Sequence, residues 1–248
     1  METKVVNNDF YDDLHDEWYS TSSHPIALLR SENATRNPWI LEQIEHHMGK
    51  HSAVLDIGCG AGFLTNTLAQ SGHSVTGIDL SVESLEVAKK RDTTKNVKYI
   101  VADAFNLPFA PHSFDAVCAM DLLEHISDPQ LVVQQAARVL KPGGLFFFHT
   151  FNRNWFSWLV VIKGVEVFVK NTPKNMHILK WFIKPEELKR YMEKEGMEVL
   201  HCQGLSPNVW SRAFWKMIFT RKVPHDFQFV MHPKTTCGYV GVARKSQR

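Results

Sequence analysis

Two carboxylates and an imidazole lie close together in the stretch Met120-Asp-Leu-Leu-Glu-His125. Asp121, Glu124 and His125 directly follow an apolar run that is typical of a buried strand. Carboxylate oxygens and imidazole nitrogens are hard or borderline ligands, so these three residues could hold Mg²⁺ or a similar divalent ion. Without a metal, His125 could act as a general base beside Glu124, or could simply pack. We therefore expect the chemistry at Glu124 and His125, with a metal site at Asp121, Glu124 and His125 as one alternative.

A glycine-rich stretch, Val54-Leu-Asp-Ile-Gly-Cys-Gly-Ala-Gly62, predicts a ligand site earlier in the chain. A short apolar run ends in Asp56 and breaks into Gly58 and Gly60, and a helix-forming stretch follows. Strand, glycine loop and helix in this order let a ligand lie against bare backbone. A second apolar run ends in Asp79, where an acid can accept hydrogen bonds from the two hydroxyls of a ribose. The sequence therefore predicts a nucleoside-containing cofactor.

The spacing of the glycines narrows the choice of cofactor. Dinucleotide sites carry G-x-G-x-x-G with a helix N-terminus directed at a pyrophosphate, whereas this chain has G-x-G-x-G preceded by Asp56. The pattern resembles motif I of class I methyltransferases that use S-adenosylmethionine (SAM). SAM has an ammonium and a sulfonium but no phosphate, so an acid beside the loop suits it. A dehydrogenase does not fit this spacing, and a non-catalytic scaffold would not need Asp56, Gly58 and Asp79.

Regular alternation of strand and helix patterns predicts an α/β fold with a doubly wound, mostly parallel sheet. We expect one domain over 1–248, with a helical cap in 1–50 and a lid insertion at 152–182. Strands are predicted at Ala53–Ile57, Val75–Asp79, Val97–Val101, Phe114–Met120 and Leu145–Thr150, with edge strands at Met197–Leu205 and Tyr239–Arg244. Helices are predicted at Leu64–Gln70, Val82–Lys90, Gln130–Val139 and Pro185–Glu195.

Composition and charge bear on the compartment and the partners. The net charge is +2 and no long basic run precedes the tail, so we expect no nucleic-acid partner. The four cysteines are scattered, which argues against a disulfide framework and favours a reducing compartment. Residues 1–8 look like neither a signal peptide nor a transit peptide, so we expect a cytoplasmic protein.

Two amphipathic stretches are candidates for contact with a membrane surface. Within 154–170, apolar residues recur at helical spacing, at Trp155, Trp158, Leu159, Ile162, Val165, Phe168 and Val169. The stretch is too short and too charged to span a bilayer, which needs about 20 apolar residues. It could pack over the active site, or its Trp and Lys side chains could meet lipid headgroups. Aromatic and basic residues also alternate within 209–222. This stretch belongs to the segment 206–235, whose role the pattern leaves open.

The chain resembles the ubiquinone-biosynthesis O-methyltransferases over about 18–205. The likeness includes the glycine loop, the stretch Met120–Pro129 and Val139-Leu-Lys-Pro-Gly-Gly144. More specific to this family are Thr150-Phe-Asn-Arg-Asn154 and Phe182-Ile-Lys-Pro185. The resemblance implies methyl transfer from SAM to a phenolic or catechol hydroxyl of a polyprenylated ring. The alternative is C- or N-methylation of another small molecule.

The resemblance also implies site residues and partners. Cofactor contacts would fall on Arg36, Gly58, Asp79 and Met120, and the family's E-x-x-E-H metal motif on Asp121, Glu124 and His125. Asp121 replaces a glutamate of that motif, and His149 replaces a small serine. His177 matches a histidine of the family, although its neighbours differ, and is a further site candidate. A lipophilic substrate, peripheral contact with the inner face of the cytoplasmic membrane and assembly with other quinone-pathway enzymes are expected partners.

Overall fold

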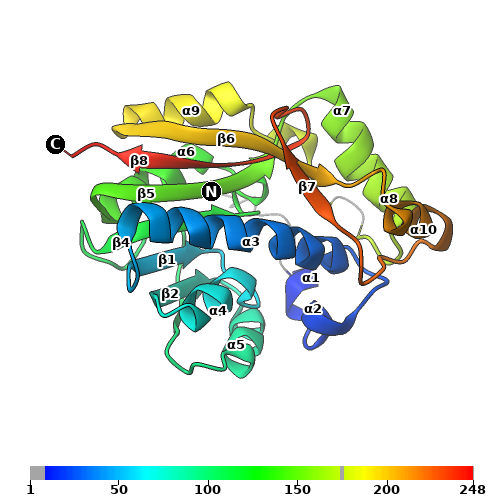
Figure 1. Cartoon of the computed structure of the whole chain (residues 1–248), viewed down its shortest axis with the longest axis horizontal. Coiled ribbons are helices and arrows are strands. Elements are labelled where there is room, and N and C mark those ends of the chain that lie inside the picture. Colours follow the sequence, from blue (N-terminus) through cyan, green and yellow to red (C-terminus); the bar gives the residue numbers. More distant parts are fainter. Residues whose placement is uncertain (1–8, 174–175, 248) are drawn as a thin grey trace.

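One mixed sheet forms the centre of the molecule (Figure 1). The computed structural model describes residues 9–173 and 176–247. In this part of the chain, eight strands lie in the order β3-β2-β1-β4-β5-β8-β6-β7. Their bounds are β1 Ala53–Ile57, β2 Ser74–Asp79, β3 Lys98–Val101, β4 Phe114–Met120, β5 Leu140–Phe151, β6 Met197–Pro207, β7 Phe229–His232 and β8 Gly238–Lys245. The order reverses between β1 and β4, the place where doubly wound sheets bind their ligands.

Strands β1 to β5 are parallel, and the remaining three introduce antiparallel pairing. β8 is antiparallel to both of its neighbours, β5 and β6, and β7 is antiparallel to β6. The predicted α/β fold with a doubly wound, mostly parallel sheet is confirmed. The prediction of edge strands at Met197–Leu205 and Tyr239–Arg244 is wrong, because β8 and β6 lie inside the sheet. The edge strand on this side of the sheet is β7, which the sequence pattern did not reveal.

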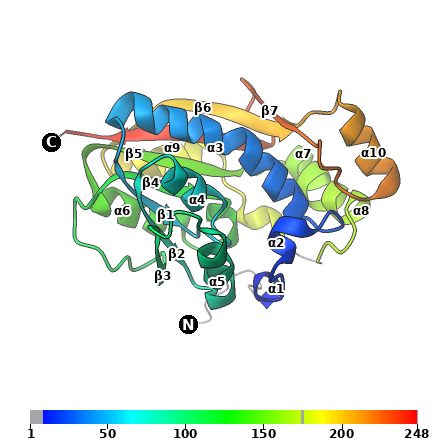
Figure 2. The same ribbon diagram turned by 60° about the horizontal axis from the view of Figure 1, so that its bottom comes forward.

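Helices cover both faces of the sheet (Figures 1 and 2). One face carries α3 (Ile26–Met48), α4 (Phe63–Gln70) and α5 (Val82–Arg91), and the other carries α6 (Pro129–Val139) and α9 (Pro185–Lys194). In β5, Leu145 and Phe147 join the core beside α3 and α4, whereas Phe146 and Phe148 join the core beside α6 and α9. This division follows from the strand itself, since successive side chains point to opposite faces.

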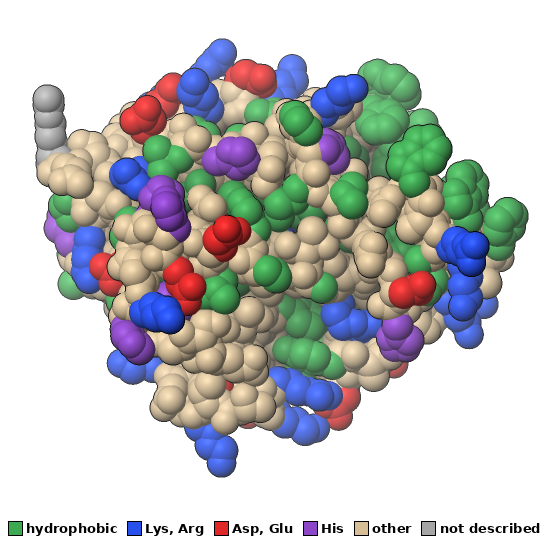
Figure 3. Space-filling view, viewed as in Figure 1, with side chains coloured by type: hydrophobic (Ala, Val, Ile, Leu, Met, Phe, Trp, Pro, Cys, Tyr) green, Lys and Arg blue, Asp and Glu red, His purple; other side chains and the backbone are tan. Residues whose placement is uncertain are grey.

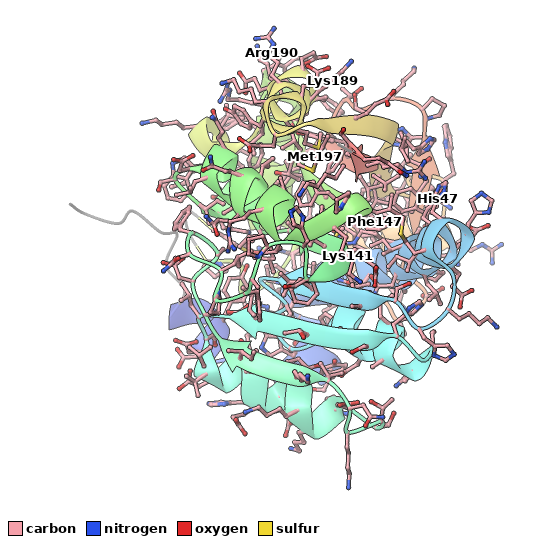
Figure 4. The ribbon with its side chains drawn as sticks, turned by 90° about the vertical axis from the view of Figure 1, so that its left-hand side faces the viewer. His47, Lys141, Phe147, Lys189, Arg190 and Met197 are labelled. Atoms are coloured by element: carbon pink, nitrogen blue, oxygen red, sulfur yellow. The ribbon has the colours of Figure 1, made fainter. Side chains whose placement is uncertain are left out.

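The packing of α9 shows the same logic at helical spacing. Leu188 and Met192, four residues apart, are buried against the sheet. Lys189 and Arg190 lie on the outer side of the helix, as Figure 4 shows. Proline at the first position of the helix and a glutamate in its first turn explain why the helix begins at Pro185.

Local capping fixes the helices that approach the site. The side chain of Ser81 accepts a hydrogen bond from the backbone of Ser84 at the start of α5. Asp128 caps α6 in the same way, with Pro129 at the first helical position. β5 begins at Leu140, five residues earlier than predicted. Leu140 pairs with Phe114 of β4, and the pairing resumes at Leu145 after a bulge near Gly143 (φ +78°).

The insertion after β5 is helical but differs from the predicted apolar stripe. It consists of α7 (Trp155–Ser157), a π-helical segment Trp158–Gly164 and α8 (Val165–Phe168). Ile162 and Val169 are buried, whereas Trp155 is 73% and Trp158 is 42% exposed. Because a π-helical turn takes more than four residues, it rotates the side chains out of the register of an α-helix. The apolar residues of 154–170 therefore do not share one face of a helix, and some lie in the core while others lie on the surface.

The remaining helices lie at the two ends of the chain. α1 (Asp9–Asp12) and α2 (Glu17–Ser20) lie beside the carboxyl ends of the first strands, within the predicted cap (Figure 2). α10 (Arg212–Thr220) precedes β7 and packs next to α8. Among the described residues, no helix combines the length and the apolar character needed to cross a bilayer.

Candidate active site

The glycine loop between β1 and α4 is held against the end of β2. The backbone N–H groups of Gly58 and Cys59 both donate to the carbonyl of Ile78, at 2.8 and 3.0 Å. Gly60 has φ +49°, and a Cβ atom there would lie 3.2 Å from the indole of Trp18. Glycine at this position therefore permits both the left-handed backbone and the close approach of α2.

Two acids flank this loop, as predicted. Asp79 Oδ2 accepts a hydrogen bond from Gly60 N at 2.8 Å, and its Oδ1 accepts one from Ser81 N at 3.0 Å. Each carboxylate oxygen has a further lone pair, so Asp79 can still accept hydrogen bonds from a ribose. Burial raises the pKa of Asp56 to about 8, although the positive charge of Arg36 counteracts it. A cationic group of a ligand would favour the ionised form of Asp56.

One cavity gathers the residues expected at the cofactor. Its wall includes Arg36, Asp56, Gly58, Gly60, Asp79 and Met120. Contact of each of them with SAM stays a prediction. The wall also includes Tyr11, Trp18 and Asp103, which the sequence reasoning did not name. Asp103 comes just after β3 and Asp79 ends β2, so an acid near the end of a strand is a signal that could have indicated Asp103. The rings of Tyr11 and Trp18 lie 5.5 Å apart and come from the N-terminal helices, whose position the sequence does not give.

Four charged residues form a buried row beside this cavity. The guanidinium of Arg36 donates to both oxygens of Asp121, at 3.0 and 2.7 Å. Nδ1 of His149 contacts Oδ1 of Asp121, and its Nε2 lies 3.0 Å from a carboxylate oxygen of Glu32. Burial would lower the pKa of His149, but Glu32 and Asp121 outweigh it and raise this pKa to about 10. The row therefore alternates in sign: Arg36, Asp121, His149, Glu32.

The row draws on α3 and on the ends of two neighbouring strands. Glu32 and Arg36 are one helical turn apart, so they share a face of α3. Asp121 directly follows β4 and has φ +54°, a left-handed conformation that aspartate adopts more readily than most residues. Burial would raise the pKa of Asp121, but the charges of Arg36 and His149 hold it far below its usual range.

The expected metal ligands separate into two clusters. Within the described chain, potential ligand atoms of Glu124, His125 and His177 all lie within 4.8 Å of one another. Asp121 belongs to the other cluster, with Glu32 and His149. The structure therefore brings Glu124 and His125 together as predicted, but groups them with His177 and not with Asp121. The separation follows from the ion pairs that Asp121 makes with Arg36 and His149.

Burial sets the protonation of the cluster of Glu124, His125 and His177. Burial, with a contribution from the charge of Asp121, raises the pKa of Glu124 to about 8. Burial lowers the pKa of His125 to about 4 and that of His177 to about 3. Both imidazoles are therefore neutral near pH 7 and can accept a proton or bind a cation. Nδ1 of His125 has no hydrogen-bond partner within the described structure, whereas hydrogen bonding from the backbone of Glu124 and from the side chain of Thr150 partly offsets the rise in the pKa of Glu124.

A second, larger cavity of about 550 Å³ lies on the other side of this cluster. Its wall is almost entirely apolar and is built from the insertion, α3, α10 and β7. Phe151 belongs to β5, Leu159 and Phe168 to the insertion, and Phe214 and Met217 to α10. Its few charged groups are near the cluster, apart from Lys163. Such a cavity suits a largely apolar ligand with one polar end.

The two cavities meet at shared residues. Tyr11, Leu29, Asp121 and His125 belong to both walls. A ligand in the glycine-loop cavity and another in the apolar cavity would therefore face each other across Asp121 and His125. The arrangement fits transfer of a group between two bound molecules.

Comparison with known proteins agrees with this geometry. The methyltransferase domain family matches residues 55–148. A SAM-dependent methyltransferase of Methanosarcina mazei has the same fold, with a TM-score of 0.60, 23% identity, and coverage of 83% of this chain and 98% of that chain. The magnesium protoporphyrin IX methyltransferase of Synechocystis PCC 6803 also shares the fold, with a TM-score of 0.60, 15% identity, and coverage of 88% and 84%.

Curated relatives identify the family. The ubiquinone biosynthesis O-methyltransferase of Escherichia coli (strain SMS-3-5 / SECEC) is 38% identical over 189 residues, which cover 75% of this chain and 78% of the relative. The protein of the same name from Shigella flexneri serotype 5b (strain 8401) matches with the same identity and coverage. The chain is therefore a SAM-dependent methyltransferase that belongs to the ubiquinone biosynthesis O-methyltransferase family.

Proposed function

We propose that the chain methylates a phenolic or catechol hydroxyl on a ring that carries a polyprenyl tail, in ubiquinone biosynthesis. The observation that supports this most directly is the meeting of the two cavities at Asp121 and His125. The glycine-loop cavity would hold SAM, and the apolar cavity would hold the ring with part of its tail. The names of the curated relatives point to the same reaction.

The residues of the chain can orient the two substrates and exclude water from the reaction. When bound, SAM supplies the methyl group, which leaves its sulfur and forms a bond to the acceptor oxygen, so that S-adenosylhomocysteine remains. Asp79 would accept hydrogen bonds from the ribose, and Asp56 would face the positive charge of the cofactor. Because Glu124 and His125 are buried, the acceptor hydroxyl would meet them away from bulk water.

The acceptor hydroxyl must lose its proton, since a phenol has an unperturbed pKa near ~10. His125 is neutral near pH 7 and lies where the cavities meet, so it is the proposed proton acceptor. Glu124, adjacent to it, is largely protonated near pH 7, because its pKa is raised to about 8, so it can donate a hydrogen bond to the acceptor oxygen. The buried carboxyl of Glu124 and the unpartnered Nδ1 of His125, within the described residues, fit a divalent cation such as Mg²⁺. Such an ion would lower the pKa of the hydroxyl.

An assay of acceptor preference tests this function. We would measure release of S-adenosylhomocysteine with catechols that carry no tail, a short prenyl tail or a long one. The expected result is that kcat/KM rises with the tail, because each buried methylene contributes about 0.8 kcal/mol. Equal kcat/KM for all three acceptors, or turnover only with an amine, would contradict the proposal.

We also propose that the insertion, 154–170, contacts the inner face of the cytoplasmic membrane. Trp155, Phe156, Trp158 and Leu159 are all exposed, and Figure 3 shows hydrophobic side chains gathered over α7. Indole rings and nearby lysines suit the interface between headgroups and acyl chains. Cosedimentation with anionic vesicles should fall for Trp155→Ala with Trp158→Ala. Unchanged binding would contradict the proposal. Trp39→Phe, far from the insertion, is the control.

Two further expectations belong to this function. We propose that other enzymes of the quinone pathway assemble with this one, since a lipophilic product would otherwise have to partition back into the bilayer. Copurification of a tagged chain with enzymes that modify the same ring would support it. We expect no binding to nucleic acid, because the net charge is only +2. A gel-shift assay at low salt checks this.

A further inference from the structure

We propose that Glu32 forms a binding subsite for a second hydroxyl of the acceptor ring, next to the hydroxyl that is methylated. His149 holds the carboxylate of Glu32 in place and acts as a positioning residue. The inference deepens the proposed function and rests on it, because it assumes a phenolic ring in the apolar cavity. It explains how the chain would distinguish a catechol from a phenol with a single hydroxyl.

Glu32 lies on the part of α3 that forms the wall of the apolar cavity. Leu28, Leu29 and Glu32 all line this cavity, and their spacing of three and four residues places them on one face of the helix. Leu29 and Asp121 also line the glycine-loop cavity, whereas Glu32, of these two cavities, lines the apolar one alone. Glu32 is therefore directed at the space of the acceptor, close to where the two cavities meet.

The carboxylate of Glu32 can accept a further hydrogen bond. Its Oε1 lies 3.0 Å from Nε2 of His149, and within residues 9–173 and 176–247 this is the only polar contact of the carboxylate. Glu32 is 6% exposed, and both oxygens of a carboxylate accept hydrogen bonds. Placing a carboxylate in an apolar wall is costly unless its oxygens are hydrogen-bonded, so the position favours a ligand that brings a donor.

The contacts of His149 fix where the carboxylate of Glu32 lies. Nδ1 of His149 contacts Asp121, so Nε2 is the nitrogen directed at Glu32. β8 approaches the same imidazole closely, since a Cβ atom at Gly238 would lie 3.3 Å from Nε2. The imidazole is thus confined between β4, β8 and α3, and it holds Glu32 at the cavity wall.

Phe151 connects this end of the cavity with the residues proposed to meet the reacting hydroxyl. It follows His149 by two positions in β5, so the two side chains share a face of the strand, and their ring centroids are 5.5 Å apart. The ring of His177 lies 5.4 Å from Phe151 and 5.2 Å from His125. An acceptor ring lying against Phe151 would therefore reach His125 and Glu32 together.

The other acids at this end of the cavity are less suited to the second hydroxyl. Asp121 already accepts hydrogen bonds from Arg36 through both oxygens, and His149 contacts one of them. Glu124 is largely protonated near pH 7, because its pKa is raised to about 8, so it is a hydrogen-bond donor there. Glu32 is therefore the acid best placed to accept a hydrogen bond from a hydroxyl that keeps its proton.

Two matched acceptors test the inference. One is a catechol with a short prenyl tail, and the other is the same compound with one hydroxyl replaced by hydrogen. Calorimetry would measure the binding of each to the full-length chain saturated with S-adenosylhomocysteine, with EDTA present so that no metal ion chelates the two hydroxyls. Separate assays would measure kcat/KM for methyl transfer from SAM to each acceptor.

The variants separate a role in binding from a structural one. Glu32→Gln keeps the shape of the side chain and exchanges a charged acceptor for a neutral one. A second variant combines Glu32→Met with His149→Ser, which removes the carboxylate without leaving an unpaired imidazole. Glu42→Gln, at an exposed position of α3, is the matched control. SAM binding and circular dichroism report whether each variant is folded.

Wild type and Glu42→Gln should bind the catechol roughly 10–100-fold more tightly than the phenol, the effect of one hydrogen bond to a charged group. In Glu32→Gln the preference should fall to about 2–10-fold, the effect of a neutral hydrogen bond, and in the double variant it should disappear. SAM affinity and phenol binding should change little, because the phenol lacks the second hydroxyl.

The inference is overturned if wild type has no preference, or if both variants keep the wild-type preference. It is also overturned if Glu32→Gln weakens both acceptors equally, since a purely structural role in balancing the charge of His149 would have that effect. A preference that Glu32→Gln loses, in a chain that methylates neither acceptor, would support the subsite and count only against the proposed function.

Discussion

Arg36 binds Asp121 through two hydrogen bonds, Nη1 to Oδ1 at 3.0 Å and Nη2 to Oδ2 at 2.7 Å, and is itself only 1% exposed. This contact joins α3 to the end of β4 at the point where the two cavities meet. Because Asp121 lines both cavities, its position affects the cofactor and the acceptor alike. The pair therefore links the N-terminal helices to the chemistry of the site.

Replacing Arg36 by lysine should weaken the site although the charge is kept. Lysine is a point charge and cannot form the planar, two-pronged contact. We expect the free energy of unfolding to fall by about 1–3 kcal/mol, the cost of an unmet buried hydrogen bond. SAM should also bind more weakly. Urea unfolding and a SAM titration check both, with Arg91→Lys at an exposed position as control. Wild-type values for both quantities in Arg36→Lys would contradict the account.

His149 predicts a dependence of stability on pH. Its pKa is about 10 in the folded chain and near ~6.5 when unfolded, so its stabilising effect is complete below pH ~6.5 and is lost as the pH rises towards 10. His149→Asn should lower the free energy of unfolding by about 3–5 kcal/mol at pH 6, as expected on breaking a buried pair. The difference from wild type should shrink steadily up to pH 10.

A second buried histidine provides the control for that measurement. Burial lowers the pKa of His73 below that of an unfolded histidine. Protonation of His73 therefore affects stability only at acidic pH, and there it destabilises the folded chain. His73→Asn should therefore show no shrinking difference between pH 6.5 and 10. If His149→Asn differs from wild type by the same amount at pH 6 and pH 10, His149 is not charged in the folded chain.

Asp79→Asn should weaken SAM binding by roughly 10–100-fold. Hydrogen bonds to a charged group contribute about 1.5–3 kcal/mol, and asparagine offers one acceptor oxygen where aspartate offers two. The measurement is a calorimetric titration with SAM. Asp128→Asn is a matched control, because asparagine caps a helix as well as aspartate does and α6 should be unaffected. Equal affinity in the two variants would remove Asp79 from the cofactor site.

His125→Ala should reduce turnover by about 10²–10⁴-fold, the usual contribution of a general base, with little change in SAM affinity. Because burial lowers the pKa of His125 to about 4, wild-type turnover should not lose this base through protonation until the pH approaches that value. Stopped assays across pH 4–8 and a SAM titration check both points. A parallel loss of turnover and of SAM affinity would contradict the assignment.

Met217→Trp should discriminate between acceptors by tail length. Met217 is buried in α10 and lines the apolar cavity, so a larger side chain there would fill space that a tail needs. We expect kcat/KM to fall by at least about tenfold, or 1.4 kcal/mol, for a long prenyl tail and to stay nearly constant for a short one. Phe219→Trp, on the same helix but 81% exposed, is the control. Equal losses for both tails would contradict the position of the tail.

The central strands and the glycine loop could be predicted because their signals are local. β1 and β4 have the predicted bounds, and Asp79 closes β2 beside the loop as the spacing implied. β7 and α10 could not be predicted with the same ease. β7 has only four residues and owes its strand conformation to pairing with β6, a contact that no local pattern records.

The buried row shows why the site itself was only partly predictable. Glu32, Asp121 and His149 are far apart in the sequence and meet only because α3 crosses the ends of β4 and β5. The sequence shows that His149 replaces a serine of the family, but it does not predict that Glu32 and Asp121 contact His149. The same contacts explain why Asp121 is separated from Glu124 in the structure although the two are three residues apart in sequence.

The most direct test of the central claim is the position of the transferred methyl group. SAM carrying a ¹³C-labelled methyl would be incubated with a prenylated catechol and the chain, and the product examined by NMR. The account predicts a labelled carbon bonded to a ring oxygen, formed in equal amount with S-adenosylhomocysteine. A label on a ring carbon, or no labelled product from a chain that binds SAM tightly, would contradict it.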